Sequence, residues 1–520
     1  MKKITLLLVM LMSFCIMLFG TESKPKKIIV FGSSVASGWI SSLNEQYDMQ
    51  NGWAFRLERF LENKGFQVIN KSVPGDNTDS ALKRFDKAVI KENPDILIIS
   101  LSLSNEGLGS KPDKEVIDNF MNNLNKMIEK AEANQIKVII GSCYANNEFS
   151  KEDFEVIKKT NIQLQSLNKP VINLLGNFSD LNGHFPENHS FDGLHPDNFG
   201  HEEMFLGIVP GLFNQLLNHK TTLNKFIPSD FEKIVKSKPF YFVPESIMHS
   251  FCLHLKTKKL KHLKFDLSHT KGELEITIEP KNLMIISKDE LGKKEITMTD
   301  LKSKTDFNSI TYDYNYANRI FHIYLNDTII AEFPIEAEPL MLSLSTDKSY
   351  MAKDLLLYRT SLLPYEIQLL NNNQLYHAGL EVYLKNISDK EQLALSNSSF
   401  TNDIIIANER KNKLAAEINQ YNQKRSSMPV FKDKTAIDMT EEKLAGFVGS
   451  YLNDQVGEIL IAFKEGKLLL NVMGNQAQIF PESENIFFMK HPAKITLEYS
   501  ENKDQVKLSA FGQEFVGKKK

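Results

Sequence analysis

The sequence predicts a multidomain protein in which an α/β/α unit with a parallel sheet precedes two all-β units. Three observations support this prediction. The chain has 520 residues, and single hydrophobic cores stop growing near about 250–300 residues, so several domains are expected. Short apolar runs alternate with amphipathic helical patterns between residues 27 and 218, whereas after residue 237 the two-residue period of strands takes over. The composition, 42% hydrophobic and 24% charged, is that of folded protein.

The first 23 residues have the features of a signal peptide. Two N-terminal lysines precede an almost purely apolar run at residues 4–19, and small and polar residues follow. This run is shorter than the ~20 residues that cross a bilayer, which favours cleavage over an uncleaved membrane anchor. We therefore expect a mature protein that begins near residues 21–24, is exported to the periplasm, cell surface or medium, and keeps no stable membrane span.

The net charge and the cysteine content argue against a nucleic-acid partner and against a disulfide-stabilised fold. The formal net charge is −3, so no whole-chain field exists to hold a polyanion, and we expect no nucleic-acid partner. Once the signal is removed, Cys143 and Cys252 remain, in segments assigned to different domains. Two distant cysteines make a poor disulfide framework, so buried free thiols are predicted.

Residues 27–218 carry the pattern of the α/β unit. Short apolar runs are typical of strands that are buried on both faces of a parallel sheet. Such strands are predicted at residues 27–31, 66–70, 96–100, 137–141 and 171–174. Between them, apolar residues recur at helical spacing, and Gly65 stands where the C-cap of one helix belongs.

Three further segments follow the α/β unit. Residues 237–386 alternate apolar and polar residues around an Asn326-Asp327 turn, which predicts an antiparallel β-sandwich. Residues 387–434 are polar and helical in pattern and are interpreted as a connector. Residues 435–518 contain short strands, two of them joined at Gly466, and predict a small antiparallel β-domain.

The first candidate for chemistry is Ser34, in a Ser-rich turn that runs from Gly32 to Gly38 after the first predicted strand. Ligands of open parallel sheets bind at the carboxyl ends of the strands, so a hydroxyl at this place is presented to a cleft. The alternative is a loop that only caps the next helix.

Three other segments supply what a serine nucleophile requires. Asp192 precedes His195 by three residues, so one short loop carries both a base and the carboxylate that fixes its tautomer. Gly75 and Asn105 follow predicted strands, and the Gly75 N–H, the Asn105 amide and the Ser34 N–H could converge on an oxyanion. Each residue also has a simpler alternative role: Asp192 and His195 in a solvated loop, Gly75 in a turn and Asn105 as a helix cap.

The four segments together, in this order, resemble the SGNH (GDSL-type) hydrolases. The matching residues are Gly32-Ser33-Ser34, Gly75, Asn105 and Asp192-x-x-His195. The resemblance implies an α/β/α fold with a flavodoxin-like parallel sheet, a Ser34, Asp192 and His195 triad, and an oxyanion hole built from Ser34, Gly75 and Asn105. Ser33 replaces the usual Asp of the family, and Leu103 replaces a Gly that usually precedes the oxyanion-hole Asn by two positions.

Four histidines lie close together in the sequence and raise the question of a metal site. They are His184, His189, His195 and His201. Their spacings match no compact ligand pair on a helix, and few cysteine or acidic partners accompany them. We expect neither a metal nor a cofactor.

The two later units carry weaker resemblances. Residues 237–386 are similar to a concanavalin-like (laminin-G-like) β-sandwich, mainly through the run at 353–362. Such domains often bind glycans, and a purely structural role is the alternative. The segment at 444–451 is similar to a small β-domain appended to some serine hydrolases of the β-lactamase type, from which no chemistry follows.

The resulting prediction is an exported serine ester hydrolase that forms an acyl-enzyme and removes O-acyl (acetyl) groups from carbohydrate or cleaves another small ester. One alternative is a lipase or thioesterase-type acyl hydrolase. Another is a glycan-binding protein whose hydrolase domain is weakly active. Because every residue proposed for chemistry precedes residue 218, a chain ending there is also predicted to hydrolyse small esters.

Overall fold

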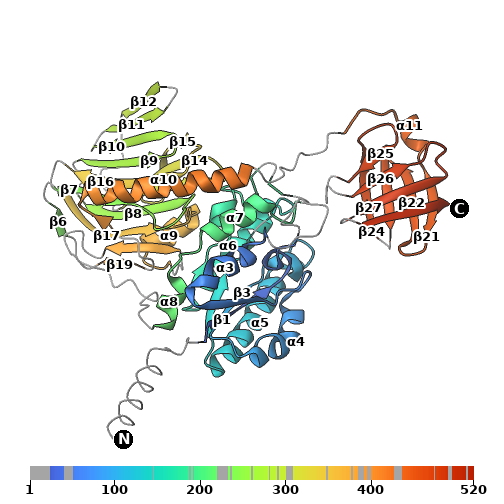
Figure 1. The fold of residues 1–520 in the computed structure, drawn as a ribbon, viewed down its shortest axis with the longest axis horizontal. Coiled ribbons are helices and arrows are strands. Elements are labelled where there is room, and N and C mark those ends of the chain that lie inside the picture. The colour runs from blue at the N-terminus through green and yellow to red at the C-terminus, as the bar shows by residue number, and fades with distance from the viewer. Residues whose placement is uncertain are drawn as a thin grey trace, which may run out of the picture.

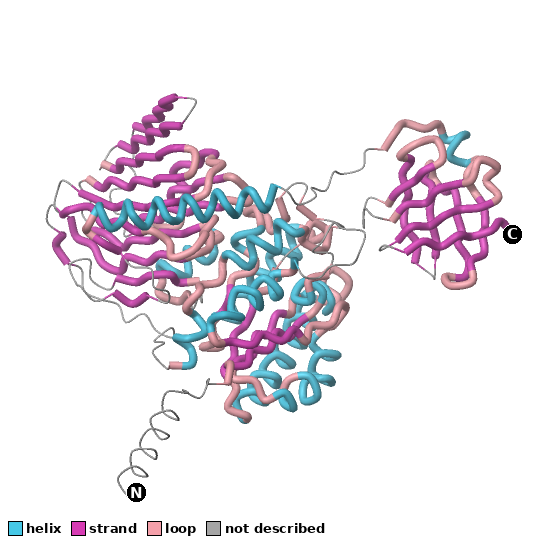
Figure 2. Tube along the Cα trace, viewed as in Figure 1, coloured by secondary structure: helices cyan, strands magenta, loops and turns pink. Residues whose placement is uncertain are grey.

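The computed structural model shows a layered α/β unit, a strand-rich unit and a small barrel (Figure 1). The described residues are 24–39, 51–144, 146–186, 189–190, 193–218, 232–234, 237–258, 262–279, 282–289, 292–299, 309–346, 350–375, 379–384, 392–394, 400–426, 436–472, 475–489, 495–510 and 513–520. The predicted signal peptide and Asp192 lie outside these ranges. Within them, no helix is both long and apolar enough to cross a membrane. Figure 2 shows that most helices belong to the first part of the chain, whereas strands dominate the rest.

A five-stranded parallel sheet with the order β2-β1-β3-β4-β5 forms the centre of the first unit. Its strands are β1 (Lys26–Gly32), β2 (Phe66–Asn70), β3 (Ile96–Ser100), β4 (Lys137–Gly141) and β5 (Val171–Ile172). All five coincide with predicted strands, although β5 is shorter than expected. The apolar runs are explained by burial of both faces, since Ile28 and Val30 of β1 belong to one core cluster and Ile29 and Phe31 to another.

Helices cover both faces of this sheet. On the Ile28 face the core includes residues of α3 (Trp53–Leu61), α7 (Asn198–Leu206) and α8 (Leu212–Leu217). On the Ile29 face it includes residues of α4 (Thr78–Ala88), α5 (Asp113–Ala133) and α6 (Lys151–Gln165). Short 3-10 turns connect these elements at η2 (Glu62–Lys64), η3 (Ile90–Glu92), η4 (Leu103–Glu106) and η5 (Gly176–Phe178). Gly65 ends η2 with a φ of 81°, which confirms its predicted role as a helix C-cap.

Two antiparallel sheets form the second unit. The first has the order β12-β11-β10-β9-β16-β7-β20, with β7 (Ser237–Phe242), β9 (Leu263–His269), β10 (Gly272–Ile278), β11 (Asn282–Asp289), β12 (Gly292–Thr299), β16 (Pro339–Thr346) and β20 (Phe400–Thr401). The second has the order β15-β14-β13-β8-β17-β18-β19, with β8 (Phe251–Lys258), β13 (Ser309–Asn315), β14 (Ile320–Leu325), β15 (Thr328–Pro334), β17 (Tyr350–Tyr358), β18 (Leu380–Leu384) and β19 (Gln392–Ala394); β6 (Glu232–Ile234) also pairs with β17. Apolar side chains of both sheets share one core, in which the rings of Phe265 and Tyr312 stack 4.3 Å apart. The turn between β14 and β15 lies at Asn326 and Asp327, as predicted.

The predicted connector at 387–434 is instead largely part of the sandwich. It contains β19, β20 and the long helix α10 (Ile404–Ser426), and β20 pairs with β7. Although α10 is polar overall, Ala407, Leu414 and Ile418 form a narrow apolar stripe that packs with Val243 and Leu340 of the sandwich. Figure 1 shows α10 lying across the strands. The stripe is too narrow to stand out from the polar sequence, which explains the incorrect interpretation.

The C-terminal unit is a closed antiparallel barrel preceded by α11 (Glu441–Ala445). Its strands, paired in chain order, are β21 (Gly449–Asn453), β22 (Gly457–Lys464), β23 (Lys467–Val472), β24 (Asn475–Pro481), β25 (Ile486–Phe488), β26 (Thr496–Tyr499), β27 (Gln505–Ala510) and β28 (Gln513–Lys519). Among the described residues, its apolar core contains only residues of the barrel and of the segment that leads into it. The barrel therefore has the core of an independent domain.

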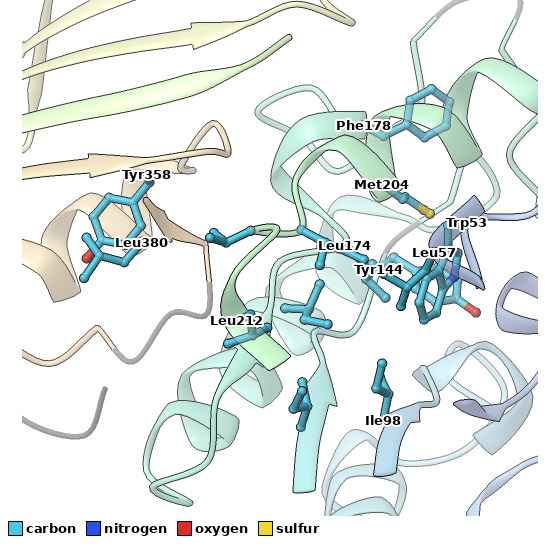
Figure 3. Close-up of a cluster of buried hydrophobic side chains, with 14 of the residues drawn as sticks. Trp53, Leu57, Ile98, Tyr144, Leu174, Phe178, Met204, Leu212, Tyr358 and Leu380 are labelled. Carbon is cyan, nitrogen blue, oxygen red and sulfur yellow. The ribbon is translucent and has the colours of Figure 1, made fainter. Parts of the chain in front are cut away.

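The α/β unit and the sandwich share one apolar core. Figure 3 shows this cluster, in which Tyr358 and Leu380 of the sandwich accompany residues of the α/β unit such as Trp53 and Leu174. The two backbones also approach closely, because a Cβ atom added to Gly176 would lie 2.1 Å from the Ser361 carbonyl oxygen. These two units are therefore fused rather than merely linked.

Buried polar contacts cross the same boundary. The Asn173 amide donates to the Glu366 carboxylate at 3.0 Å, and the Ser361 N–H donates to the Asn177 side-chain oxygen at 2.9 Å. Glu203 of α7 and His249 of the sandwich form a fully buried pair in which Nδ1 lies 2.6 Å from Oε1. Burial lowers the pKa of His249, but the charge and hydrogen bond of Glu203 outweigh burial, so the pKa is raised above its usual value of 6.5.

Replacement of His249 with Gln is expected to destabilise the protein more at about pH 6 than at about pH 9. A group whose pKa is raised by folding contributes stability that is complete below its unfolded pKa and is lost as the pH rises through its folded pKa. Breaking a buried ion pair costs about 3–5 kcal/mol. Thermal unfolding of the wild type and His249→Gln at both pH values measures the effect, and an equal loss at both would contradict a charged pair.

Candidate active site

The turn after β1 separates the two neighbouring serines. A Cβ atom added to Gly32 would lie 2.0 Å from the Ser100 carbonyl oxygen, so glycine is required where β1 and β3 end side by side. Ser33 is buried, and its hydroxyl lies 3.5 Å from the Tyr144 hydroxyl. Ser34 begins the short helix α2 (Ser34–Ser37) and is half-buried. Of the two, Ser34 is the serine that remains partly accessible.

His195 lies directly against Ser34, with its Nε2 atom 2.9 Å from the serine Oγ. This distance allows the serine hydroxyl to donate a hydrogen bond to a neutral imidazole. The loop that carries His195 is fixed internally by Ser190, whose hydroxyl donates to the His195 carbonyl at 3.0 Å and accepts from the Gly193 N–H at 2.9 Å. The predicted partner Asp192 lies outside the described residues. The sequence pattern did not indicate Ser190, because a serine in a polar loop has no distinguishing context.

The two remaining predicted residues also lie at the carboxyl edge of the sheet. Gly75 follows β2 with a φ of 82°, a left-handed conformation that favours glycine, and it is exposed. Asn105 lies in η4 after β3, and its side-chain amide donates to the Asp76 carbonyl at 3.0 Å. An Asn amide has two N–H bonds, so this contact ties the Asn105 loop to the Gly75 loop and leaves a second donor.

Two charged side chains that no motif indicated, one half-buried and one buried, hold these loops in place. Arg84 of α4 forms an ion pair with Asp76 at 2.5 Å and donates to the Gly32 carbonyl at 3.3 Å, so it joins the Gly75 loop to the turn that precedes Ser34. Glu106 accepts a hydrogen bond from the Thr78 N–H at 2.5 Å. Burial raises the pKa of Glu106. Gly32 lies 52 residues from Arg84 in the sequence, and Thr78 lies 28 residues from Glu106, so spacing alone could not reveal these contacts.

The four histidines considered as metal ligands have separate surroundings. His195 lies beside Ser34, His189 lies 3.1 Å from Asp197, and His184 lies 3.8 Å from Asp180. His201 is buried, accepts a hydrogen bond from the Trp53 N–H at 3.3 Å, and has its pKa lowered by burial to about 3. In the described part of the chain, no group of three or more His, Cys, Asp or Glu side chains could hold a metal ion. Cys143 and Cys252 are buried free thiols, as predicted.

Part of the chain is similar to known esterases. It is 31% identical over 124 residues to an arylesterase of Vibrio mimicus, a match that covers 24% of this chain and 56% of the relative. It is 27% identical over 136 residues to esterase TesA of Pseudomonas aeruginosa, which covers 25% of this chain and 62% of the relative. The chain thus spans less than two thirds of the length of either relative.

Solved structures with similar folds have lower identity. A lipase/acylhydrolase from Enterococcus faecalis is 22% identical, with a TM-score of 0.27, and covers 38% of this chain and 94% of its own. A catalytic mutant of Axe2, an acetylxylan esterase from Geobacillus stearothermophilus, is 16% identical, with a TM-score of 0.28, and covers 35% of this chain and 90% of its own. Residues 30–203 of this chain match the model of the GDSL-like Lipase/Acylhydrolase family.

Proposed function

We propose that the protein is a serine ester hydrolase whose nucleophile is Ser34 and whose general base is His195. The observation that carries the proposal is the 2.9 Å contact between Ser34 Oγ and His195 Nε2. A serine hydroxyl is a weak nucleophile unless an adjacent base accepts its proton as it attacks, and this contact places such a base within reach. The match of residues 30–203 to a lipase and acylhydrolase family supports the same class of reaction.

The reaction would proceed through an acyl-enzyme. Ser34 Oγ attacks the ester carbonyl carbon while its proton passes to His195, and the imidazolium then returns the proton to the departing alcohol. The N–H groups of Ser34 and Gly75 and the amide of Asn105 are proposed to stabilise the oxyanion. Water, deprotonated by His195, releases the acid and restores Ser34. Asp192 is proposed to orient His195 from the same loop.

The location of the covalent intermediate tests this proposal. The full-length protein would be assayed on p-nitrophenyl acetate and longer esters, treated with a fluorophosphonate, and digested for mass spectrometry. We expect hydrolysis, its loss upon treatment, and one adduct on Ser34. An active protein with no adduct, or with an adduct on Ser33, would contradict the assignment, and relative rates on acetyl and longer esters would separate an acetyl esterase from a lipase or thioesterase.

A glycan ligand of the sandwich is a second proposed function, and a groove on its first sheet supports it. The groove has a volume of about 240 Å³ and lies on the face opposite the core, because Phe265 and Leu267 of β9 point inward while Asp266 lies between them in the groove. One residue from each of five adjacent strands forms a row of cross-strand neighbours across the groove: Ile286, Glu275, Asp266, Ser343 and Tyr241. Since neighbouring strands lie ~4.8 Å apart, this row is about 19 Å long and suits an elongated ligand.

The chemistry of the groove suits a neutral polyhydroxylated chain. Lys264 lies 2.9 Å from Glu275 and 3.2 Å from Asp266, and Ser343 donates to Asp266 at 2.9 Å, so opposite charges largely compensate one another. Carboxylates, a lysine and serines accept from and donate to sugar hydroxyls, while the ring of Tyr241 offers an apolar surface. O-acylated carbohydrate, the substrate class that we propose, would then be held on the same chain as the esterase site. Export of the protein would bring the groove and the esterase site to carbohydrate outside the cytoplasm.

Affinity electrophoresis of full-length protein tests the groove without relying on catalysis. We expect retardation in native gels that contain xylan, galactomannan or hydroxyethyl cellulose, and about a tenfold weaker effect for Glu275→Gln, because a hydrogen bond to a charged group contributes about 1.5–3 kcal/mol. Glu465→Gln in the barrel is the matched control and should behave like the wild type. Absence of retardation by all three polysaccharides, or equal retardation of Glu275→Gln, would exclude the groove as a glycan site.

A further inference from the structure

The last turn of α10 contacts α7 of the hydrolase domain. The Arg425 guanidinium lies 3.3 Å from the Glu202 carboxylate and 4.8 Å from the centre of the Phe199 ring, over its face. The Tyr421 hydroxyl donates a hydrogen bond to the same carboxylate. Glu202 also pairs with Arg56 of α3 at 3.5 Å. The helix that crosses the sandwich therefore ends on a buried carboxylate of the hydrolase domain.

The residues under Arg425 belong to the frame of the His195 loop. The Phe199 ring packs against the His189 ring at a tilt of 32°, with 4.2 Å between the ring centres, and His189 Nδ1 lies 3.1 Å from Asp197 Oδ2. The Asp197 N–H in turn donates to the His189 carbonyl at 3.2 Å, and Asp197 caps the start of α7. His189 and Asp197 thus close the ends of the segment that carries His195. A displacement of Phe199 or of α7 would be transmitted to the base.

The two arginines have unequal consequences for the fold. Glu202 is almost completely buried, and its side chain is 4% exposed. Removal of Glu202 would take away the ion-pair partner that Arg56 and Arg425 share, which is costly in a buried site. Removal of Arg425 leaves the Glu202–Arg56 pair in place, but takes away the cation over Phe199 and one partner of the carboxylate. Arg425 can therefore be changed with less risk to the fold than Glu202.

We propose that α10 is a positioning element for the catalytic loop, with Arg425 and Tyr421 fixing α7 and Phe199 so that His195 Nε2 stays within hydrogen-bond reach of Ser34. The proposal rests on the proposed ester hydrolase function and extends the machinery into the sandwich. Neither residue touches substrate. Small displacements of a base cost up to about 100-fold in rate, because proton transfer requires a near-attack geometry.

Arg425→Ala, Arg425→Lys and Tyr421→Phe in the full-length protein test the proposal. We expect Arg425→Ala to lower kcat between about 10- and 100-fold with KM nearly unchanged, and to slow fluorophosphonate labelling of Ser34 by a similar factor. Arg425→Lys restores the charge near Glu202 and should recover part of the rate, and Tyr421→Phe should give a smaller loss. Arg410→Ala, an exposed arginine on the same helix, is the matched control and should leave both rates unchanged.

Three outcomes would overturn the positioning role. They are wild-type kcat and labelling rate in folded Arg425→Ala, a change confined to KM, and a rate loss that is fully accounted for by the unfolded fraction in circular dichroism. Wild-type protein that neither hydrolyses esters nor accepts the fluorophosphonate would instead overturn the proposed function. The two failures are therefore distinguishable in one set of measurements.

Discussion

Ser34→Ala is expected to reduce kcat for p-nitrophenyl acetate by about 10⁴- to 10⁶-fold and to abolish fluorophosphonate labelling. The substitution removes the atom proposed to form the covalent intermediate, whereas the groups proposed to bind substrate and to stabilise the oxyanion remain. KM should therefore change little. Because alanine removes a single half-buried hydroxyl, the thermal unfolding temperature should stay close to that of the wild type, and this measurement shows that the loss is catalytic.

Ser33→Ala is the matched control because it removes the neighbouring hydroxyl from the same turn. Ser33 is buried against Tyr144, and its loss should leave labelling intact with at most a modest effect on stability. If Ser33→Ala abolished labelling while Ser34→Ala retained it, the nucleophile would be Ser33. If both variants retained full activity, the reaction would not use this turn at all.

The parts of the fold and site that local sequence determines could be predicted. Strands buried on both faces require uninterrupted apolar runs, so β1 to β4 could be located from such runs alone. Ser34, Gly75 and Asn105 each follow one of these strands. Parallel strands present their carboxyl ends at one edge of the sheet. Residues that follow these ends closely therefore lie at the same edge, whatever conformation their loops adopt. His195 does not directly follow a strand, and only its motif, not the geometry of the sheet, suggested a place beside Ser34.

What could not be predicted depends on pairs that are far apart in the sequence. Arg84 is one of 62 Lys and Arg residues, and only the folded chain brings it to the Gly32 carbonyl, 52 residues away in the sequence. The position of α10 depends on three small or apolar side chains in an otherwise polar helix. At position 176, the tightest contact that requires glycine comes from the Ser361 backbone of the sandwich. Periodicity describes one element at a time, so it carries no information about such contacts.

The fused core reverses the sequence-based expectation for a chain that ends at Asn218. Such a chain would lose Tyr358, Leu362, Ile367 and other sandwich residues from the shared apolar cluster. The apolar side chains of the α/β unit that these residues cover would then be exposed to water. Each large apolar side chain returned to water costs about 1.5–3 kcal/mol, and the total stability of a domain is about 5–15 kcal/mol. Exposure of a handful of such side chains is enough to unfold the domain. We therefore expect the shortened chain to aggregate or to show no cooperative unfolding, and to lack activity even on p-nitrophenyl acetate.

A chain that ends at Ser426 is the matched comparison, because it keeps α10 and removes the barrel. In the part of the chain that the structure describes, the barrel core contains no residue of the other two units. Loss of the barrel should therefore expose little apolar surface, and Arg425 stays on Glu202. We expect this chain to be monodisperse, to unfold cooperatively and to keep kcat and KM on p-nitrophenyl acetate within about twofold of the full-length values, since surface changes away from a core usually alter stability by less than about 0.5 kcal/mol. Size-exclusion chromatography, thermal unfolding and steady-state kinetics would show whether each of the two shortened chains is folded and active. A folded, active chain ending at Asn218 would show that the hydrolase domain is autonomous and that the shared cluster contributes little, whereas an inactive chain ending at Ser426 would place a necessary contact in the barrel.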